Sequence, residues 1–72
     1  MDIHAYRIYF EEIAKDAQKA LAAIDNGTGV VLPPGAENFF ADNNLAYLAT
    51  CISNDAATLC QQLGVEPWSY YN

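Results

Sequence analysis

The sequence contains no lysine or arginine after Lys19. From Ala20 to Asn72 its charged side chains are all carboxylates: Asp25, Glu37, Asp42, Asp55 and Glu66. The whole chain has 9 acidic and 3 basic residues, for a net charge of -6. Such a chain repels the phosphates of nucleic acids and anionic membranes, and it attracts a basic surface. The scarcity of cations predicts that the chain does not bind nucleic acid directly and that its partner is a positively charged protein.

Long hydrophobic runs are also absent. Charged residues, asparagine or proline interrupt every apolar stretch well before the roughly 20 residues that a membrane span requires. The start, Met1-Asp2-Ile3-His4, shows neither a basic region nor the cleavage site of a secretory signal. The sequence therefore predicts a cytoplasmic protein outside the membrane.

Histidine and cysteine are scarce. His4 is the only histidine, and it is expected on the exposed side of a helix, where it forms no catalytic triad. Cys51 and Cys60 are nine residues apart, a spacing that fits neither a CxxC redox pair nor a zinc knuckle. We expect them to be buried thiols in helices. A disulfide between them is the alternative.

No other residue pattern indicates catalysis. Glu11, Glu12 and Asp16 share one helix, but without a histidine or a cleft to shift a pKa they indicate a solvated surface. The Gly27-Thr28-Gly29 loop lacks the lysine and the preceding strand of a phosphate-binding loop. The sequence predicts that the protein is not an enzyme and that it binds neither a metal nor a cofactor.

The apolar pattern of the first third predicts a helix over residues 3–25 with one buried stripe. The stripe recurs every three or four residues: Ile3, Tyr6, Phe10, Ile13, Ala17, Leu21 and Ile24. Asp2 is placed to cap its start, and Asn26-Gly27 suits its end. A strand from Ile3 to Phe10 is the alternative, because tyrosine, isoleucine and phenylalanine favour strands.

The rest of the chain predicts an extended connector and two shorter helices. Residues 28–35 are too rich in glycine and proline for a helix, and 36–41 is expected to make a helical turn that buries Phe39 and Phe40. Helices are predicted over 44–53 and 55–63, because Ser53-Asn54-Asp55 resembles a second set of capping residues. One helix over 44–63 is the alternative, since its apolar positions stay in phase. The predicted fold is all-α: one domain, residues 1–72, with three main helices.

Residues 57–71 resemble the helix-turn-helix of transcriptional repressors, with Cys60 as the small residue of the first helix and Gly64 as the turn glycine. The apolar positions that match are Leu59, Leu63, Val65 and Tyr70. The segment that would read DNA, however, offers Glu66, Trp68, Ser69, Tyr70 and Tyr71 in place of basic and amide side chains. If the fold is kept, its surface has another use.

In size, acidity and absence of a catalytic motif, the chain is similar to the small inhibitors of phages and mobile elements, including anti-CRISPR proteins and nucleic-acid mimics. That resemblance implies a non-enzymatic inhibitor that occupies the basic, nucleic-acid-handling surface of a partner. The residues expected to bind are the five carboxylates after Lys19, joined by Trp68, Tyr70 and Tyr71.

The alternative is a helical interaction or assembly module, either a homodimer or a subunit of a larger complex. It would use an apolar patch of Phe39-Phe40, Trp68, Tyr70 and Tyr71, while the carboxylates keep it soluble. In another interpretation, Trp68 and one tyrosine pack back over the helices to close the core. Salt dependence separates the two functions, because an acidic mimic loses affinity at high ionic strength and an apolar interface does not.

Overall fold

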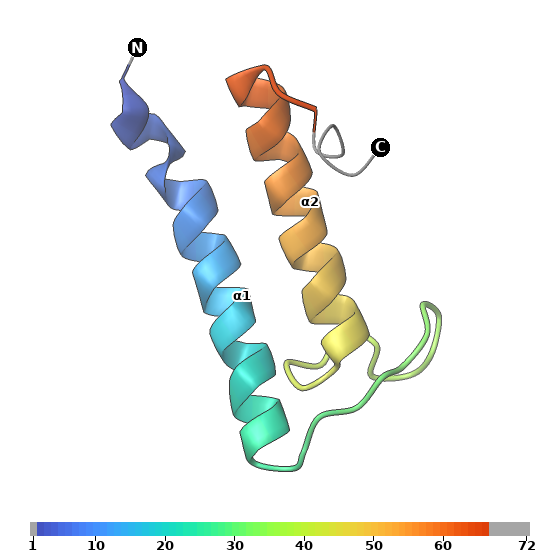
Figure 1. Cartoon of the computed structure of the whole chain (residues 1–72). Helices are drawn as coiled ribbons and strands as arrows, with labels where there is room; N and C mark the ends of the chain where they lie inside the picture. The colour runs from blue at the N-terminus through green and yellow to red at the C-terminus, as the bar shows by residue number, and fades with distance from the viewer. Residues whose placement is uncertain (1, 67–72) are drawn as a thin grey trace.

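The computed structural model describes residues 2–66, which form a hairpin of two long helices. A short 3-10 helix, η1 (Ile3–Tyr6), leads into α1 (Arg7–Asp25), and α2 (Leu45–Leu63) runs back alongside it. The start of α1 and the end of α2 therefore lie at the same end of the molecule, the open end (Figure 1). Residues 26–44 connect the helices at the other end, the closed end.

The predicted three-helix bundle is wrong, because the segments expected over 44–53 and 55–63 form the single helix α2. The alternative of one helix over 44–63 is confirmed. Asn54, a predicted capping residue, lies inside this helix, where its carbonyl accepts a hydrogen bond of 3.0 Å from the Thr58 hydroxyl. Capping side chains stabilise a helix only at its first residues, so they contribute nothing here unless the preceding helix ends. Here Leu48 and Leu59 are both buried, and an unbroken helix keeps them on one side.

The predicted helix over 3–25 is present, with its first four residues in the tighter 3-10 form. The alternative strand from Ile3 to Phe10 is wrong. Asp2 accepts a hydrogen bond of 2.9 Å from the His4 amide, as a capping residue does. At the ends of the two helices, Gly27 (φ 69°) and Gly64 (φ 76°) adopt the left-handed conformation that glycine tolerates best.

Asn44 holds the connector against the start of α2. Its side chain is fully buried, at 0% exposure. The amide nitrogen donates to the carbonyls of Phe39 (2.7 Å) and Leu32 (3.3 Å), and the amide oxygen accepts from the backbone N–H groups of Leu32 (2.9 Å) and Ala46 (3.2 Å). The expected helical turn over 36–41 consists of non-helical turns instead. The Asn44 side chain thus supplies hydrogen bonds that regular secondary structure would otherwise give to the backbone of this segment.

The two helices meet along residues spaced alternately three and four apart, the spacing of a coiled-coil seam. These seam residues are Tyr9, Ile13, Asp16, Ala20 and Ala23 on α1, and Leu45, Leu48, Ile52, Asp55, Leu59 and Gln62 on α2. All are buried or half-buried except Gln62, whose amide donates a hydrogen bond of 2.6 Å to the Tyr9 hydroxyl at the open end. In residues 2–66 the buried apolar side chains are only Ala23, Phe39, Leu48 and Leu59.

Candidate functional site

Three large apolar side chains of α1 lie beside the seam and outside the core. Phe10, Leu21 and Ile24 are 56%, 59% and 57% exposed. Each follows a seam residue by one position, and one residue turns an α-helix by about 100°. They belong to the stripe predicted to be buried, of which the structure half-buries Tyr6, Ile13 and Ala17. The prediction that the whole stripe is buried is therefore wrong.

The corresponding side of α2 carries small side chains. Because the helices run antiparallel, a step of one residue beyond the seam leads to the same side of the hairpin in both helices. The positions that follow seam residues therefore form one surface, which we call the apolar face: Phe10, Ala14, Ala17, Leu21 and Ile24 on α1, and Ala46, Ala49, Ser53, Ala56, Cys60 and Leu63 on α2. None of the eleven is charged, and α1 contributes all the large members except Leu63.

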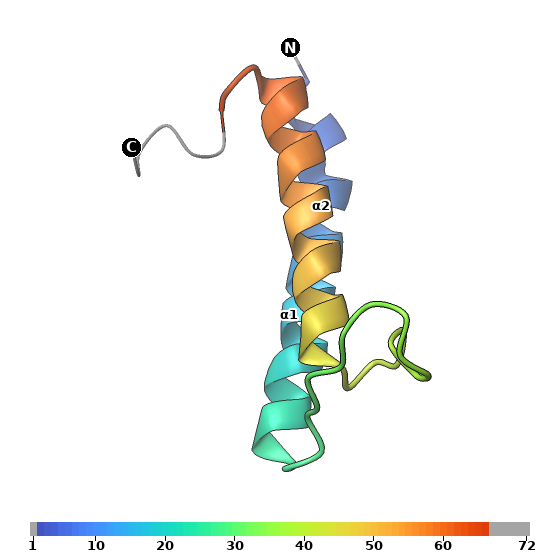
Figure 2. The same ribbon diagram turned by 90° about the vertical axis from the view of Figure 1, so that its right-hand side faces the viewer.

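The opposite side of the hairpin, the connector face, carries the residues that precede seam residues. It includes the charged residues Glu12, Lys15 and Lys19 of α1. The Lys19 ammonium lies 3.4 Å from the Asp42 carboxylate in the connector. Figure 2 shows the connector projecting to one side of the paired helices. Among the described residues, the connector therefore covers this face and not the apolar face.

Three aromatic rings join the connector to α2 on the connector face. Phe39, Phe40 and Tyr47 pack edge to face, with ring centroids 5.2–5.6 Å apart. The expectation that both phenylalanines are buried is confirmed for Phe39 and wrong for Phe40, which is 75% exposed. A side-chain hydrogen bond with Cys51, with smaller effects of nearby negative charge and burial, raises the pKa of Tyr47 above its usual value.

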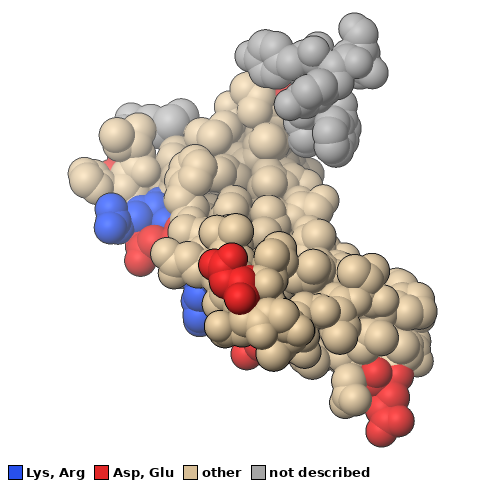
Figure 3. Space-filling view, turned by 60° about the horizontal axis from the view of Figure 1, so that its bottom comes forward, with Lys and Arg blue, Asp and Glu red and all other residues tan. Residues whose placement is uncertain are grey.

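The carboxylates predicted to bind a partner lie in different parts of the hairpin. Asp25, Glu37 and Asp42 are exposed towards the closed end, Asp55 is half-buried in the seam, and Glu66 follows α2 at the open end. Since α2 is about 28 Å long, the set spans most of the molecule. On the face drawn in Figure 3, acidic side chains form separate areas divided by uncharged surface. The structure therefore does not gather the five into one cluster.

The predicted aromatic residues Trp68, Tyr70 and Tyr71 lie outside the described residues. The same holds for most of the segment that the helix-turn-helix resemblance would place on DNA. Gly64, its turn glycine, ends α2.

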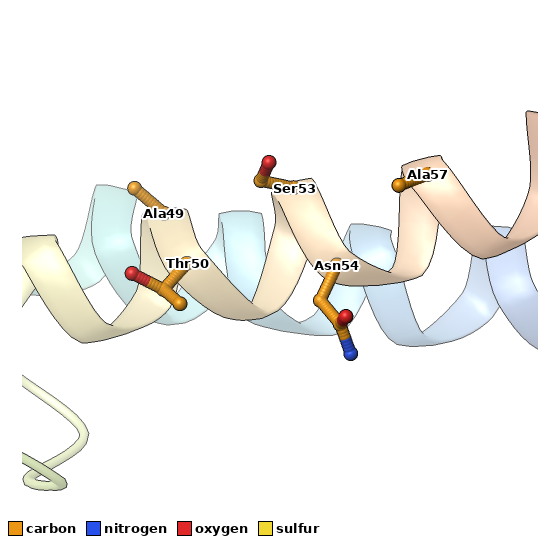
Figure 4. A pocket seen from close by; sticks show the side chains of 5 residues that line it. All are labelled: Ala49, Thr50, Ser53, Asn54 and Ala57. Carbon is orange, nitrogen blue, oxygen red and sulfur yellow. The ribbon is translucent and has the colours of Figure 1, made fainter. Parts of the chain in front are cut away.

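A shallow hollow lies on the outer side of α2. Its lining residues are Ala49, Thr50, Ser53, Asn54 and Ala57, shown in Figure 4. The Thr50 hydroxyl donates to the Ala46 carbonyl of its own helix (2.8 Å), and no lining side chain titrates near neutral pH. The hollow therefore offers no acid or base that could activate the hydroxyls of Thr50 and Ser53. It adjoins the apolar face at Ala49 and Ser53, and extends a surface of small side chains.

In the described part of the chain, the residues considered for catalysis and metal binding are not grouped into a site. His4 is exposed, and Glu11 pairs with Arg7 (3.1 Å). Cys51 and Cys60 are free and half-buried. Within residues 2–66, no group of three histidine, cysteine or acidic side chains is placed to hold a metal ion. Neither described helix has the combination of length and apolarity that a transmembrane segment needs.

Sequence reasoning missed the apolar face because it treated the stripe of the first helix as core. A signal was present: Tyr9, Asp16 and Ala23 form a second row at seven-residue intervals beside that stripe. Two adjacent rows on one helix indicate two contact surfaces. Comparisons of the chain with protein-family models, with curated protein sequences and with solved structures find no match.

Proposed function

We propose that this chain is a non-enzymatic helical association module whose apolar face binds a protein partner. The observation that supports this function is the exposure of Phe10, Leu21 and Ile24 in one uncharged surface. Burying the exposed part of each of these side chains contributes about 1–2 kcal/mol to association. Continuous apolar surface of this kind is typical of interaction sites.

Photo-crosslinking tests the function directly. Leu21 is replaced by p-benzoylphenylalanine in the full chain, which is then irradiated in a lysate of its source cells. Ile8 provides a matched control, because it is equally apolar, similarly exposed (63%) and on the connector face of the same helix. We expect protein adducts from position 21 and few from position 8. Equal yields from the two positions would show that the apolar face is not the contact surface.

An acidic inhibitor of the anti-CRISPR or nucleic-acid-mimic type is the second candidate. It is favoured by the exposure of Asp25 and Glu37 towards the closed end and by the net charge of -6. A third probe, replacing Glu37, tests it in the same experiment. Adducts formed from position 37 to a nucleic-acid-handling protein, lost at high salt and absent from position 21, would replace the association module by the inhibitor.

A further inference from the structure

We propose that the occupant of the apolar face is a second copy of this chain, so that two hairpins form a symmetric four-helix bundle. This inference rests on the proposed function and names the partner.

The apolar face is large enough for a specific interface. A helix of 19 residues is about 28 Å long, and two adjacent helices are about 20 Å wide, which gives a face on the order of 600 Å². Two copies would bury about 1,200 Å² together, the lower limit for stable specific complexes. We therefore expect a dimer in the micromolar range of affinity.

The face is complementary to itself. Three of its four large side chains, Phe10, Leu21 and Ile24, are on α1, and most of its small ones, including Ala49, Ala56 and Cys60, are on α2. A two-fold axis parallel to the helices places α1 of each copy on α2 of the other. Leu21 and Ile24 of one copy then pack over small side chains of the other, as close packing requires, and Phe10 meets Leu63 at the open end.

Charge also favours a second copy over a basic partner. The apolar face has no carboxylate that could pair with a basic partner. The ion pair between Lys19 and Asp42 lies on the opposite side, the connector face. In the dimer, the charges of the connector faces point away from the interface, and Asp16 and Asp55 stay in the seam of each copy. The two copies still repel each other through their net charges, and this repulsion falls as salt screens it. Dimerisation should therefore tighten as ionic strength rises.

The size of the core leads to the same conclusion. Four buried apolar side chains in residues 2–66 form a small core, and the two cysteines form no disulfide. Chains of this length that lack such staples commonly gain their stability by oligomerising. A second copy would bury Phe10, Leu21 and Ile24 of α1 at the centre of a larger core.

Sedimentation equilibrium of the purified full chain tests the inference, from 1 to 200 µM. The variants are Leu21→Glu on the apolar face and Ile8→Glu on the connector face, which add the same charge to the same helix. We expect a dimer for the wild type and for Ile8→Glu, and at least a hundredfold weaker association for Leu21→Glu. We also expect the wild-type dimer to bind severalfold more tightly at 500 mM than at 50 mM NaCl.

A wild-type monomer over the whole range would overturn the inference, as would a dimer that both substitutions weaken equally. These outcomes leave the proposed function to its own experiment. If position 21 crosslinks to a different protein while the purified chain is monomeric, the association module stands and the second copy is wrong. If Leu21→Glu fails to fold by circular dichroism, Ala49→Glu on α2 replaces it, since that side chain is exposed and outside the seam.

Discussion

Asn44 is the residue on which the described connector most depends. Its amide group satisfies a carbonyl of Phe39, both backbone groups of Leu32, and the first turn of α2. A polar side chain at 0% exposure is tolerated because these partners replace the water that it has lost. The same side chain both begins a helix and holds the loop before it.

Asn44→Ala should lower the free energy of unfolding by about 3 kcal/mol, because it removes a helix cap and leaves backbone groups of Leu32 without partners. Asn43→Ala is the matched control. Its amide makes one exposed hydrogen bond, to the Thr28 carbonyl (2.8 Å), and its loss should cost about 1 kcal/mol or less. Urea denaturation at one protein concentration measures both. Equal losses would show that the buried amide has no special role.

At the scale of the helices, the seam contains two carboxylates. The hydrogen bond between Tyr9 and Gln62 sets the register, and Asp16 and Asp55 lie seven residues from these two partners. They therefore occupy the same level of the seam, and both are half-buried. Neither belongs to the ion pairs Arg7–Glu11 and Lys19–Asp42. We infer that two like charges at this level weaken the pairing of α1 with α2.

Asp55→Leu should raise the free energy of unfolding by about 1 kcal/mol, because it removes the repulsion and adds apolar area to the seam. Asp55→Asn separates the two causes, since it removes the charge and keeps the shape. Thermal unfolding followed by circular dichroism, at a fixed protein concentration, gives the comparison. If Asp55→Leu is less stable than the wild type, the carboxylate contributes to the hairpin and our account of the seam is wrong.

At the scale of the whole molecule, the charge is nearly all of one sign. The chain has nine acidic and three basic side chains, and this excess of negative charge opposes any compact state of the chain. The repulsion acts within each hairpin as well as between two copies. It is screened by salt over a distance of about 10 Å at 0.1 M.

Raising NaCl from 20 to 500 mM should therefore increase the midpoint of thermal unfolding by several degrees. The double variant Asp25→Asn/Glu37→Gln changes the net charge from -6 to -4 at two exposed positions, and should show a smaller increase. Differential scanning calorimetry at constant protein concentration measures both. A midpoint that falls with salt would indicate that ion pairs outweigh the excess of negative charge.

Part of this fold was predictable from local chemistry. The all-α class, the helix over 3–25, the cap at Asp2 and the stop at Gly64 depend on residues close together in the chain. Of the candidate site, the apolar residues of the first helix were identified, but their exposure was not. The roles assigned to the carboxylates and to the aromatic residues after Glu66 remain predictions.

By itself, the sequence determined the periodicity, the caps and the one-sided charge, because these depend on neighbouring residues and on composition. The tertiary structure alone decided that residues 53–55 continue α2 and that Phe40 remains exposed. It also decided which residues of the apolar stripe contact α2 and which remain exposed. Each depends on contacts between segments far apart in the chain. Local signals cannot rank such alternatives, because burying Leu48 and Leu59 against α1 outweighs the modest stabilisation of a second cap.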